Sequence, residues 1–199
     1  NATFTNCDFS NLNTSLLGGS SYRYGNVLYQ SEGTTEFNSC TFNENSLTAD
    51  ANQDIRGGVY YLESGTATFN ESVFTNNSIS DGSNQKGGVF YNENGTLNFN
   101  DCVLDSNSVS SSSNGALIYS ESSSVSINMD TVSATGNSGS SLIYFENGGS
   151  FTLQTTTIDG NDGNVIQSST GSLNIDLEDV SISSNEGLGI SASGEKNLN

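Results

Sequence analysis

The residues of this chain that could do chemistry are its carboxylates, and four glutamates recur at one place in a repeat. Glu63, Glu93, Glu121 and Glu146 each follow the start of an apolar triplet by four residues. Glutamates stacked at the spacing of neighbouring strands repel one another, and carboxylate oxygens are suitable ligands for Ca²⁺. The spacing therefore predicts a weak cation stripe that binds Ca²⁺, although the residues of an EF-hand or of a nonapeptide calcium repeat are absent.

The sequence predicts no catalytic centre. It has no histidine, which removes Ser-His chemistry and the commonest transition-metal ligand. The four cations are Arg23, Arg56, Lys86 and Lys196. They are scattered, whereas elimination from an acidic sugar needs a base and cations gathered at the substrate carboxylate. Acidic residues are plentiful, but abundance does not make the fixed carboxylate pair of a glycoside hydrolase. We therefore expect a protein that is not an enzyme.

The composition excludes several partners. With 22 acidic residues against four basic ones, the net charge is −18, so nucleic acid and anionic membrane surfaces are disfavoured. No apolar run is long enough for a membrane span. The chain begins Asn-Ala-Thr, and we interpret it as part of a longer secreted precursor that is extracellular or at the cell surface.

The main signal in the sequence is an internal repeat that becomes shorter along the chain. An apolar triplet starts each unit, and its spacing falls from 32 residues (27 to 59) to 23 residues (142 to 165). The triplets begin at Val27, Val59, Val89, Leu117, Leu142 and Val165. A turn, an alternating strand and a second short strand follow, and then an Asn and a polar loop of variable length. This order predicts three short strands per unit.

These units predict an all-β fold. Alternation of period two, with β-branched and aromatic residues, favours strands over helices, and proline, which interrupts paired strands, is absent. We expect a right-handed parallel β-helix, a three-sided solenoid of about seven coils. Residues 1–199 would form a single segment of a longer solenoid or of a head-to-tail assembly. A propeller, the alternative, needs four longer strands per unit.

Parallel stacking would place equivalent residues about 4.8 Å apart, so that like side chains form ladders. One expected apolar ladder contains Phe42, Phe74, Leu104, Ile158 and Ile182, and another contains Phe37, Phe69, Phe99, Ile127, Leu153 and Ile175. The recurring Asn predicts an asparagine ladder, because Asn tolerates the left-handed conformation of a sharp corner and its amide can bond its copy in the next coil. The members of this asparagine ladder are Asn45, Asn77, Asn107, Asn137, Asn161 and Asn185.

The triplet strand is apolar on both sides, so one side is expected to face outward. The glutamates share a side with the first and third triplet residues, which assigns the middle residues to the core. The outward side would then be a contact face of Val and Tyr, flanked by the cation stripe. Its tyrosines are Tyr29, Tyr61, Tyr91, Tyr119 and Tyr144. This face is either an ordinary solenoid surface or a lateral contact surface.

Two covalent modifications are also candidates. Cys7 and Cys40 fall in one column, with Cys102 further along, so they are either buried apolar side chains or a Cys7–Cys40 disulfide. Asparagine glycosylation is possible wherever a sequon is exposed in a secreted protein. The five sequons begin at Asn1, Asn13, Asn70, Asn76 and Asn94, of which Asn76 and Asn94, near corners, are the best candidates.

The segment Phe74-Thr-Asn-Asn77, followed by Gly87-Gly88-Val89-Phe90-Tyr91, resembles the repeat of the chlamydial polymorphic membrane proteins. It is also similar to repeats in β-helical surface proteins of protists such as ciliates. The resemblance covers residues 37–107 clearly and fades beyond residue 130, where Gly-Gly has become Ser140-Ser141. It implies a pectin-lyase-like β-helix on an extracellular or cell-surface protein, with an adhesive or structural role and no catalytic site.

We therefore expect a non-catalytic structural segment of an extracellular fibre or surface appendage, which self-associates head to tail or laterally. The alternative is an adhesin passenger that binds a glycan or a host protein through its Val, Tyr and Glu face. No cofactor is expected except Ca²⁺.

Overall fold

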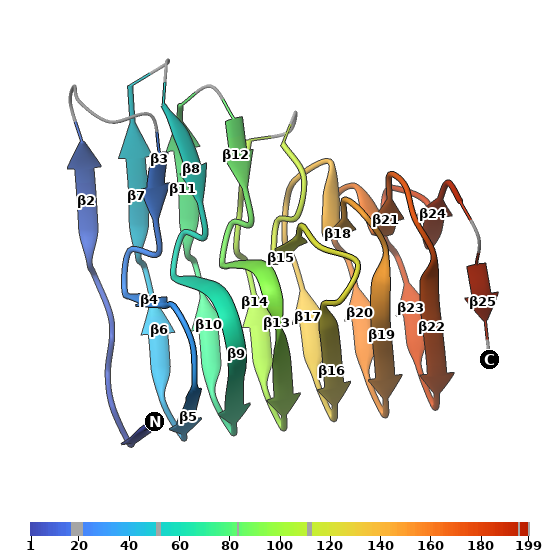
Figure 1. The fold of residues 1–199 in the computed structure, drawn as a ribbon, viewed down its shortest axis with the longest axis horizontal. Coiled ribbons are helices and arrows are strands. Elements are labelled where there is room, and N and C mark those ends of the chain that lie inside the picture. Colours follow the sequence, from blue (N-terminus) through green and yellow to red (C-terminus); the bar gives the residue numbers. More distant parts are fainter. Residues whose placement is uncertain (17–21, 51–52, 83, 111–112, 195, 199) are drawn as a thin grey trace.

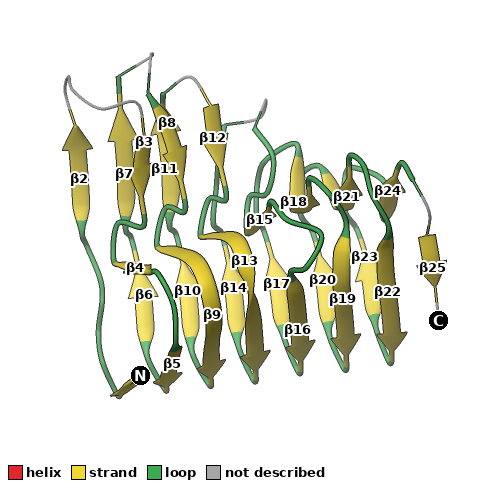
Figure 2. Ribbon diagram, viewed as in Figure 1, coloured by secondary structure: helices red, strands yellow, loops and turns green. Residues whose placement is uncertain are grey.

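The structure is a computed structural model that describes residues 1–16, 22–50, 53–82, 84–110, 113–194 and 196–198. Within these residues the chain is all-β and contains no α-helix (Figures 1 and 2). Accordingly, the described part of the chain has no helix that is long and apolar enough to cross a membrane. The strands lie side by side in curled sheets, and neighbouring strands are parallel.

The largest sheet has 13 strands. Its strands are β1 (Ala2–Thr5), β4 (Leu28–Gln30), β5 (Thr34–Asn38), β9 (Tyr60–Asn70), β13 (Phe90–Asn100), β15 (Ile118–Ser120), β16 (Ser126–Asp130), β18 (Ser141–Phe145), β19 (Gly149–Gln154), β21 (Asn164–Ser168), β22 (Leu173–Glu178), β24 (Ile190–Ala192) and β25 (Lys196–Leu198). The sheet curls because a long strand spans two shorter ones: β9 pairs with β4 at its start and with β5 at its end.

Three smaller sheets complete the fold. A six-stranded sheet consists of β6 (Thr41–Asn43), β10 (Val73–Thr75), β14 (Val103–Asp105), β17 (Ser133–Thr135), β20 (Thr157–Asp159) and β23 (Ser181–Ser183). Two three-stranded sheets consist of β2 (Asn13–Leu16), β7 (Ser46–Ala49) and β11 (Ser78–Asp81), and of β3 (Tyr22–Tyr24), β8 (Asp54–Arg56) and β12 (Asn84–Lys86). We call these last two sheets the upper lobe.

Each strand pairs with its counterpart one repeat unit away. Phe37 pairs with Phe69 and Phe69 with Phe99, while Phe42 pairs with Phe74. Side chains alternate between the core and the outer surface along β5 and along the second half of β9, as the period of a strand requires. The repeat of the sequence therefore sets the register of the sheets.

The upper lobe is the main difference from the sequence-based expectation. The sequence predicted three strands per unit and a polar loop of variable length, but in the first three units this loop holds two further strands each (Figure 1). These strands enclose a second, small core of Leu47, Ala49, Ile55, Ile79, Val109 and Ala116. The units of the C-terminal half have shorter loops and three strands each, for example β18, β19 and β20. Apolar residues within the longer loops are the physical reason for this difference.

The main core lies between the 13-stranded and six-stranded sheets and is built from stacked side chains. Phe42 and Phe74 stack with ring centroids 4.4 Å apart, and Phe37 and Phe69 with centroids 4.9 Å apart. Stacked aromatic pairs of this kind contribute about 0.5–1.5 kcal/mol beyond the area they bury. The middle triplet residues, Tyr60 among them, point into this core as expected.

Ile127 and Ile175 do not belong to the Phe37 ladder to which the sequence assigned them. Phe99 pairs with Met129, whereas Ile127 pairs with Leu97, two residues earlier. Both positions face inward, because residues two apart on a strand share a side. A shift of two residues therefore preserves the apolar pattern, and the sequence alone could not distinguish the two registers.

The corner before the asparagine ladder also differs from expectation. The positive φ angles belong to the preceding residues, such as Glu44 (55°), Asn76 (55°) and Ser106 (56°). The ladder asparagines themselves are not among the residues with positive φ. The residue before each asparagine, which is exposed, therefore makes the bend. The asparagine contributes its side-chain amide to the hydrogen bonds between units.

Candidate functional site

The asparagine ladder is a fully bonded polar column at the corner between the six-stranded sheet and the upper lobe. The Asn107 Oδ1 atom accepts bonds from the backbone N–H and the Nδ2 of Asn77, at 3.0 and 2.9 Å. Its Nδ2 donates to the Phe74 carbonyl oxygen at 2.9 Å and to Asn137 Oδ1 at 3.1 Å. Every polar function of this amide is therefore used inside the protein, which is what a buried amide requires.

The same pattern recurs at each unit, with each amide donating to the next along the chain. The column comprises the buried Asn45, Asn77, Asn107, Asn137 and Asn161 and the half-buried Asn185. Leu12 occupies the equivalent place before Asn45, and its backbone N–H donates to Asn45 Oδ1 at 3.0 Å. These hydrogen bonds hold adjacent units together, so the geometry of the column supports a role in stability.

The third triplet residues form a tyrosine column, but the column is not the exposed contact face that the sequence predicted. Tyr61, Tyr91, Tyr119 and Tyr144 are buried, and Tyr29 has 48% of its surface exposed. Ring centroids of successive tyrosines lie between 4.9 and 5.4 Å apart.

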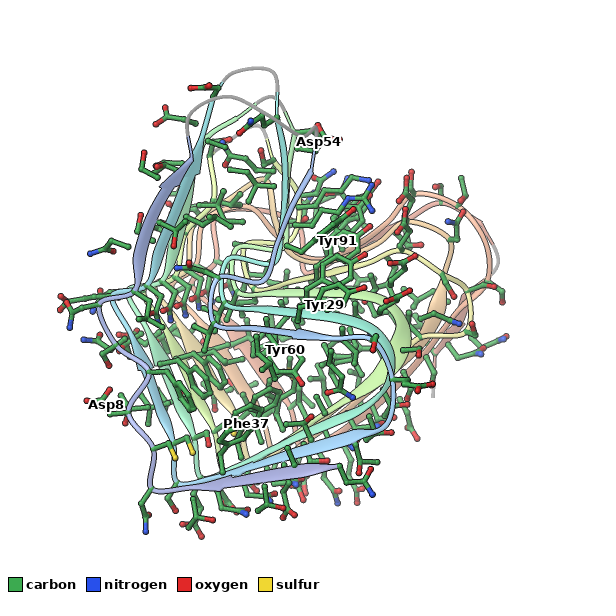
Figure 3. All side chains as sticks on the ribbon, turned by 60° about the vertical axis from the view of Figure 1, so that its left-hand side comes forward. Asp8, Tyr29, Phe37, Asp54, Tyr60 and Tyr91 are labelled. Carbon is green, nitrogen blue, oxygen red and sulfur yellow. The ribbon has the colours of Figure 1, made fainter. Side chains whose placement is uncertain are left out.

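This prediction was wrong because strands β8 and β12 of the upper lobe cover the column. Figure 3 shows Tyr29 and Tyr91 between the body and this lobe, while Phe37 and Tyr60 lie inside the body. The first triplet residues were also misplaced, since Val59 and Val89 are buried in the main core.

Each glutamate of the predicted cation stripe accepts a hydrogen bond from a tyrosine of the preceding unit. The Tyr119 hydroxyl donates to Glu146 at 2.8 Å. The other three donor–acceptor pairs are Tyr29 with Glu63, Tyr61 with Glu93 and Tyr91 with Glu121. The stripe is thus not a bare row of carboxylates, because phenol hydroxyls bind all four.

Two cations of the upper lobe complete the arrangement. The guanidinium of Arg56 lies 5.1 Å from the centre of the Tyr91 ring and 3.7 Å from a carboxylate oxygen of Glu121. Lys86 Nζ lies 4.5 Å from the centre of the Tyr119 ring and 3.4 Å from Glu146. Each cation therefore neutralises one glutamate and also contacts a ring face, a favourable cation–π arrangement.

Hydrogen bonding and burial hold the four glutamate-bonded tyrosines protonated. The bond to Glu63, followed by smaller effects of burial and of negative charge, raises the pKa of Tyr29 to about 12. Burial is the largest cause at Tyr91 and Tyr119, and their carboxylate partners raise the pKa of each further. Ionisation would place a second negative charge beside a carboxylate, so the neutral phenol is strongly preferred.

Two of the stripe glutamates, Glu93 and Glu121, and the neighbouring surface line a continuous groove. A hollow of about 460 Å³ is lined by Arg56, Glu93, Asn94, Glu121, Ser122, Ser124 and Asn147. It shares Ser122, Ser124 and Asn147 with a larger hollow of about 850 Å³, whose further lining includes Ser126, Ser150, Thr170 and Asn174. Hydroxyls, amides and carboxylates therefore alternate along an open surface, a chemistry suited to polyhydroxylated ligands.

Sequence reasoning did not predict this groove. From the sequence, Arg56 and Lys86 were only two of four scattered cations. The one available signal was the Ser-rich run from Ser122 to Ser124, which directly follows Glu121.

In the part of the chain that the structure describes, no three His, Cys, Asp or Glu side chains are grouped in a way that could hold a metal ion.

Of the two alternatives for the cysteines, the candidate Cys7–Cys40 disulfide is not formed: all three cysteines are free thiols, and Cys40 and Cys102 are buried. The two residues do share a column, since the Thr41 N–H donates to the Cys7 carbonyl. Each thiol instead points to a backbone carbonyl: Cys40 Sγ lies 3.4 Å from the Asn38 oxygen, and Cys7 Sγ lies 3.5 Å from that of Thr5.

The five sequons differ in accessibility. Asn1, Asn13, Asn76 and Asn94 are exposed. Asn70 is half-buried, and its Nδ2 donates to Asn38 Oδ1 at 2.7 Å. Because glycosylation modifies the amide nitrogen, Asn70 would have to break this bond before it could be modified.

Comparisons with known proteins found no match for this chain among family models, curated proteins or solved structures.

Proposed function

We propose that this chain is a non-catalytic structural segment of an extracellular or cell-surface protein, built as a right-handed parallel β-helix with three principal sides and about seven coils. The observation that carries the proposal is the in-register pairing of like positions along the stack, from Phe4 with Phe37 to Leu153 with Leu177. A coil of this kind cannot bury its own apolar side chains, so neighbouring coils stabilise one another into a stiff rod.

Two further features support a structural role. The buried amides of the asparagine ladder are used for bonds between units, and the phenols of the tyrosine column are bonded to glutamates. The regularly spaced amides and phenols therefore make their hydrogen bonds within the protein. Self-association of copies, head to tail or laterally, is part of the proposal, as expected of a fibre component.

A crystal or cryo-electron microscopy structure tests the coil geometry, and electron microscopy of concentrated protein tests the assembly. We expect a right-handed coil and rods with a strand repeat of about 4.8 Å along their axis. A left-handed crossing would refute the proposed coil. A monodisperse monomer at every concentration, by sedimentation, would refute self-association.

A second candidate function is carbohydrate binding in the groove, as in an adhesin. The observation that favours it is the continuity of the two hollows, which share Ser122, Ser124 and Asn147. The binding surface in this candidate is not the predicted Val and Tyr face, which is largely buried. It is the neighbouring surface of glutamate, serine and asparagine side chains. Asn94 lies in the groove, where its Oδ1 accepts a bond from the Ser122 hydroxyl at 2.9 Å.

A glycan array with two matched variants tests this candidate. Ser150→Trp fills the larger hollow, while Ser181→Trp places the same side chain on the six-stranded sheet. Carbohydrate binding requires that Ser150→Trp abolish a signal that Ser181→Trp retains. Equal signals from both variants, or no signal from the unmodified protein, would exclude the groove as a glycan site.

Ca²⁺ binding along the cation stripe is a further proposal, supported by the four half-buried carboxylates of neighbouring units. Isothermal titration with millimolar Ca²⁺ tests it, and uptake must be lost in the double variant Glu63→Gln, Glu93→Gln. If titration of the unmodified protein with Ca²⁺ released or absorbed no heat, the proposed Ca²⁺ binding would be refuted.

A further inference from the structure

The tyrosine column combines two features that together suit electron transfer. Its five rings stack in an uninterrupted row, with centroids 5.1, 5.0, 5.4 and 4.9 Å apart from Tyr29 to Tyr144. Four of the five hydroxyls donate to a carboxylate, although a backbone carbonyl would satisfy a buried phenol equally well. A phenol bonded to a carboxylate can release its proton at the moment when its ring loses an electron.

We propose that the tyrosine column is a relay for oxidising equivalents, in which the stacked rings pass an electron vacancy toward Tyr29 and the paired glutamates hold the released protons. Ring contact provides the path for the electron. The hydroxyl–carboxylate bonds of Tyr29, Tyr61, Tyr91 and Tyr119 provide the path for the proton, which moves only across one hydrogen bond at each of these four tyrosines. The activity is independent of the proposed structural role.

The charges around the column give the relay a direction. Arg56 lies over Tyr91 and Lys86 lies over Tyr119, and a nearby positive charge disfavours loss of an electron. Tyr29, at the other end, is bonded to Glu63, and the charge of Glu93 also acts on it. Negative surroundings stabilise the oxidised ring, so the vacancy settles at Tyr29.

The chemistry balances in three steps. A one-electron oxidant takes an electron from a buried tyrosine, whose proton passes to its glutamate, leaving a neutral tyrosyl radical. An electron then moves from the next ring toward this radical, the first proton returns to the first phenol, and the next phenol passes its own proton to its glutamate. At the exposed Tyr29, the radicals of two copies couple through ortho carbons. Each coupled carbon then loses a proton, and each phenol oxygen regains the proton that Glu63 holds. In total, two phenols lose two electrons and two protons. Two molecules of a peroxyl radical, the one-electron oxidant class proposed here, accept one electron and one proton each and become hydroperoxides.

A tethered photo-oxidant tests the relay at a distance. Asn147→Cys, in a Cys7→Ser background, places a ruthenium polypyridyl label three residues from the buried Tyr144. A cobalt(III) ammine serves as the electron acceptor, so no diffusing oxidant is produced. After illumination we expect dityrosine fluorescence, covalent dimers and a cross-link that peptide mass spectrometry maps to Tyr29.

Matched variants separate the relay from direct oxidation. Tyr91→Phe keeps the stacked ring but removes a redox-active phenol, so the Tyr29 cross-link should be lost. Tyr60→Phe removes a neighbouring phenol that faces the main core and donates to Gln30, so the cross-link should persist. Tyr119→Phe repeats the test if Tyr91→Phe does not fold. A Tyr29 cross-link that survives in the folded column variant, or none in the unmodified protein, would overturn the proposal.

Discussion

Removing one amide from the asparagine ladder should destabilise the whole stack. In Asn107→Ala the backbone N–H of Asn77 is left without its acceptor, while Asn77 Nδ2, the Phe74 carbonyl and Asn137 Oδ1 each lose one of their bonds. A buried unsatisfied N–H costs about 1–3 kcal/mol, and each further lost bond about 0.5–1.5 kcal/mol. Together these terms give an expected loss of about 3–7 kcal/mol, a large share of the roughly 5–15 kcal/mol that stabilises a typical domain.

The matched control is Asn98→Ala, an asparagine of the same repeat unit that points outward. Asn98 Nδ2 donates to Thr68 Oγ1 at 3.2 Å, and its Oδ1 accepts from Asn128 Nδ2 at 2.8 Å. It is half-buried, so water can replace both bonds, and we expect a loss below about 1 kcal/mol.

Urea denaturation followed by circular dichroism and by tyrosine fluorescence measures both variants. Coincident transitions are required, because repeat proteins can unfold in segments. If Asn107→Ala and Asn98→Ala were destabilised equally, the ladder would contribute no more than a surface amide. The assignment of the ladder as the bond between units would then be wrong.

Three further predictions follow from other parts of the fold. A Cβ at Gly88 would lie 2.3 Å from the Ala116 carbonyl oxygen, whereas one at Gly189 would meet nothing within 4 Å. Gly88→Ala should therefore lower the melting temperature, and Gly189→Ala should not. Equal melting temperatures of the two variants would contradict the close approach at Gly88. Burial raises the pKa of Cys102 to about 11. In the native state, Cys102 should therefore react with a thiol reagent far more slowly than the half-buried Cys7. Equal reaction rates would contradict the burial of Cys102. Burial and hydrogen bonds to glutamates raise the pKa values of Tyr61, Tyr91 and Tyr119 above the usual tyrosine value of about 10. The stabilisation that these tyrosines provide is therefore complete below about pH 10 and is lost as pH rises further. Tyrosinate absorbance should appear together with unfolding, and full ionisation in folded protein would refute the buried hydrogen bonds.

The sequence by itself determined the class of fold and much of the register. The apolar triplets and recurring asparagines indicated parallel strands stacked in register, because a strand has a period of two and like residues meet when equal units stack. The Phe42 ladder and the inward middle residues of the triplets, such as Phe90, lie as predicted. The structure also places the ladder asparagines in bonding contact.

What only the tertiary structure decided was which outward-facing residues are covered. The sequence predicted a Val and Tyr surface, since a strand with apolar residues on both sides gives no sign of what packs against each side. Two extra strands in each early loop bring Arg56 and Lys86 over Tyr91 and Tyr119, although they lie more than 30 residues away in the chain. Contacts across such a distance depend on how a loop folds back onto the stack, and local periodicity carries no information about that path.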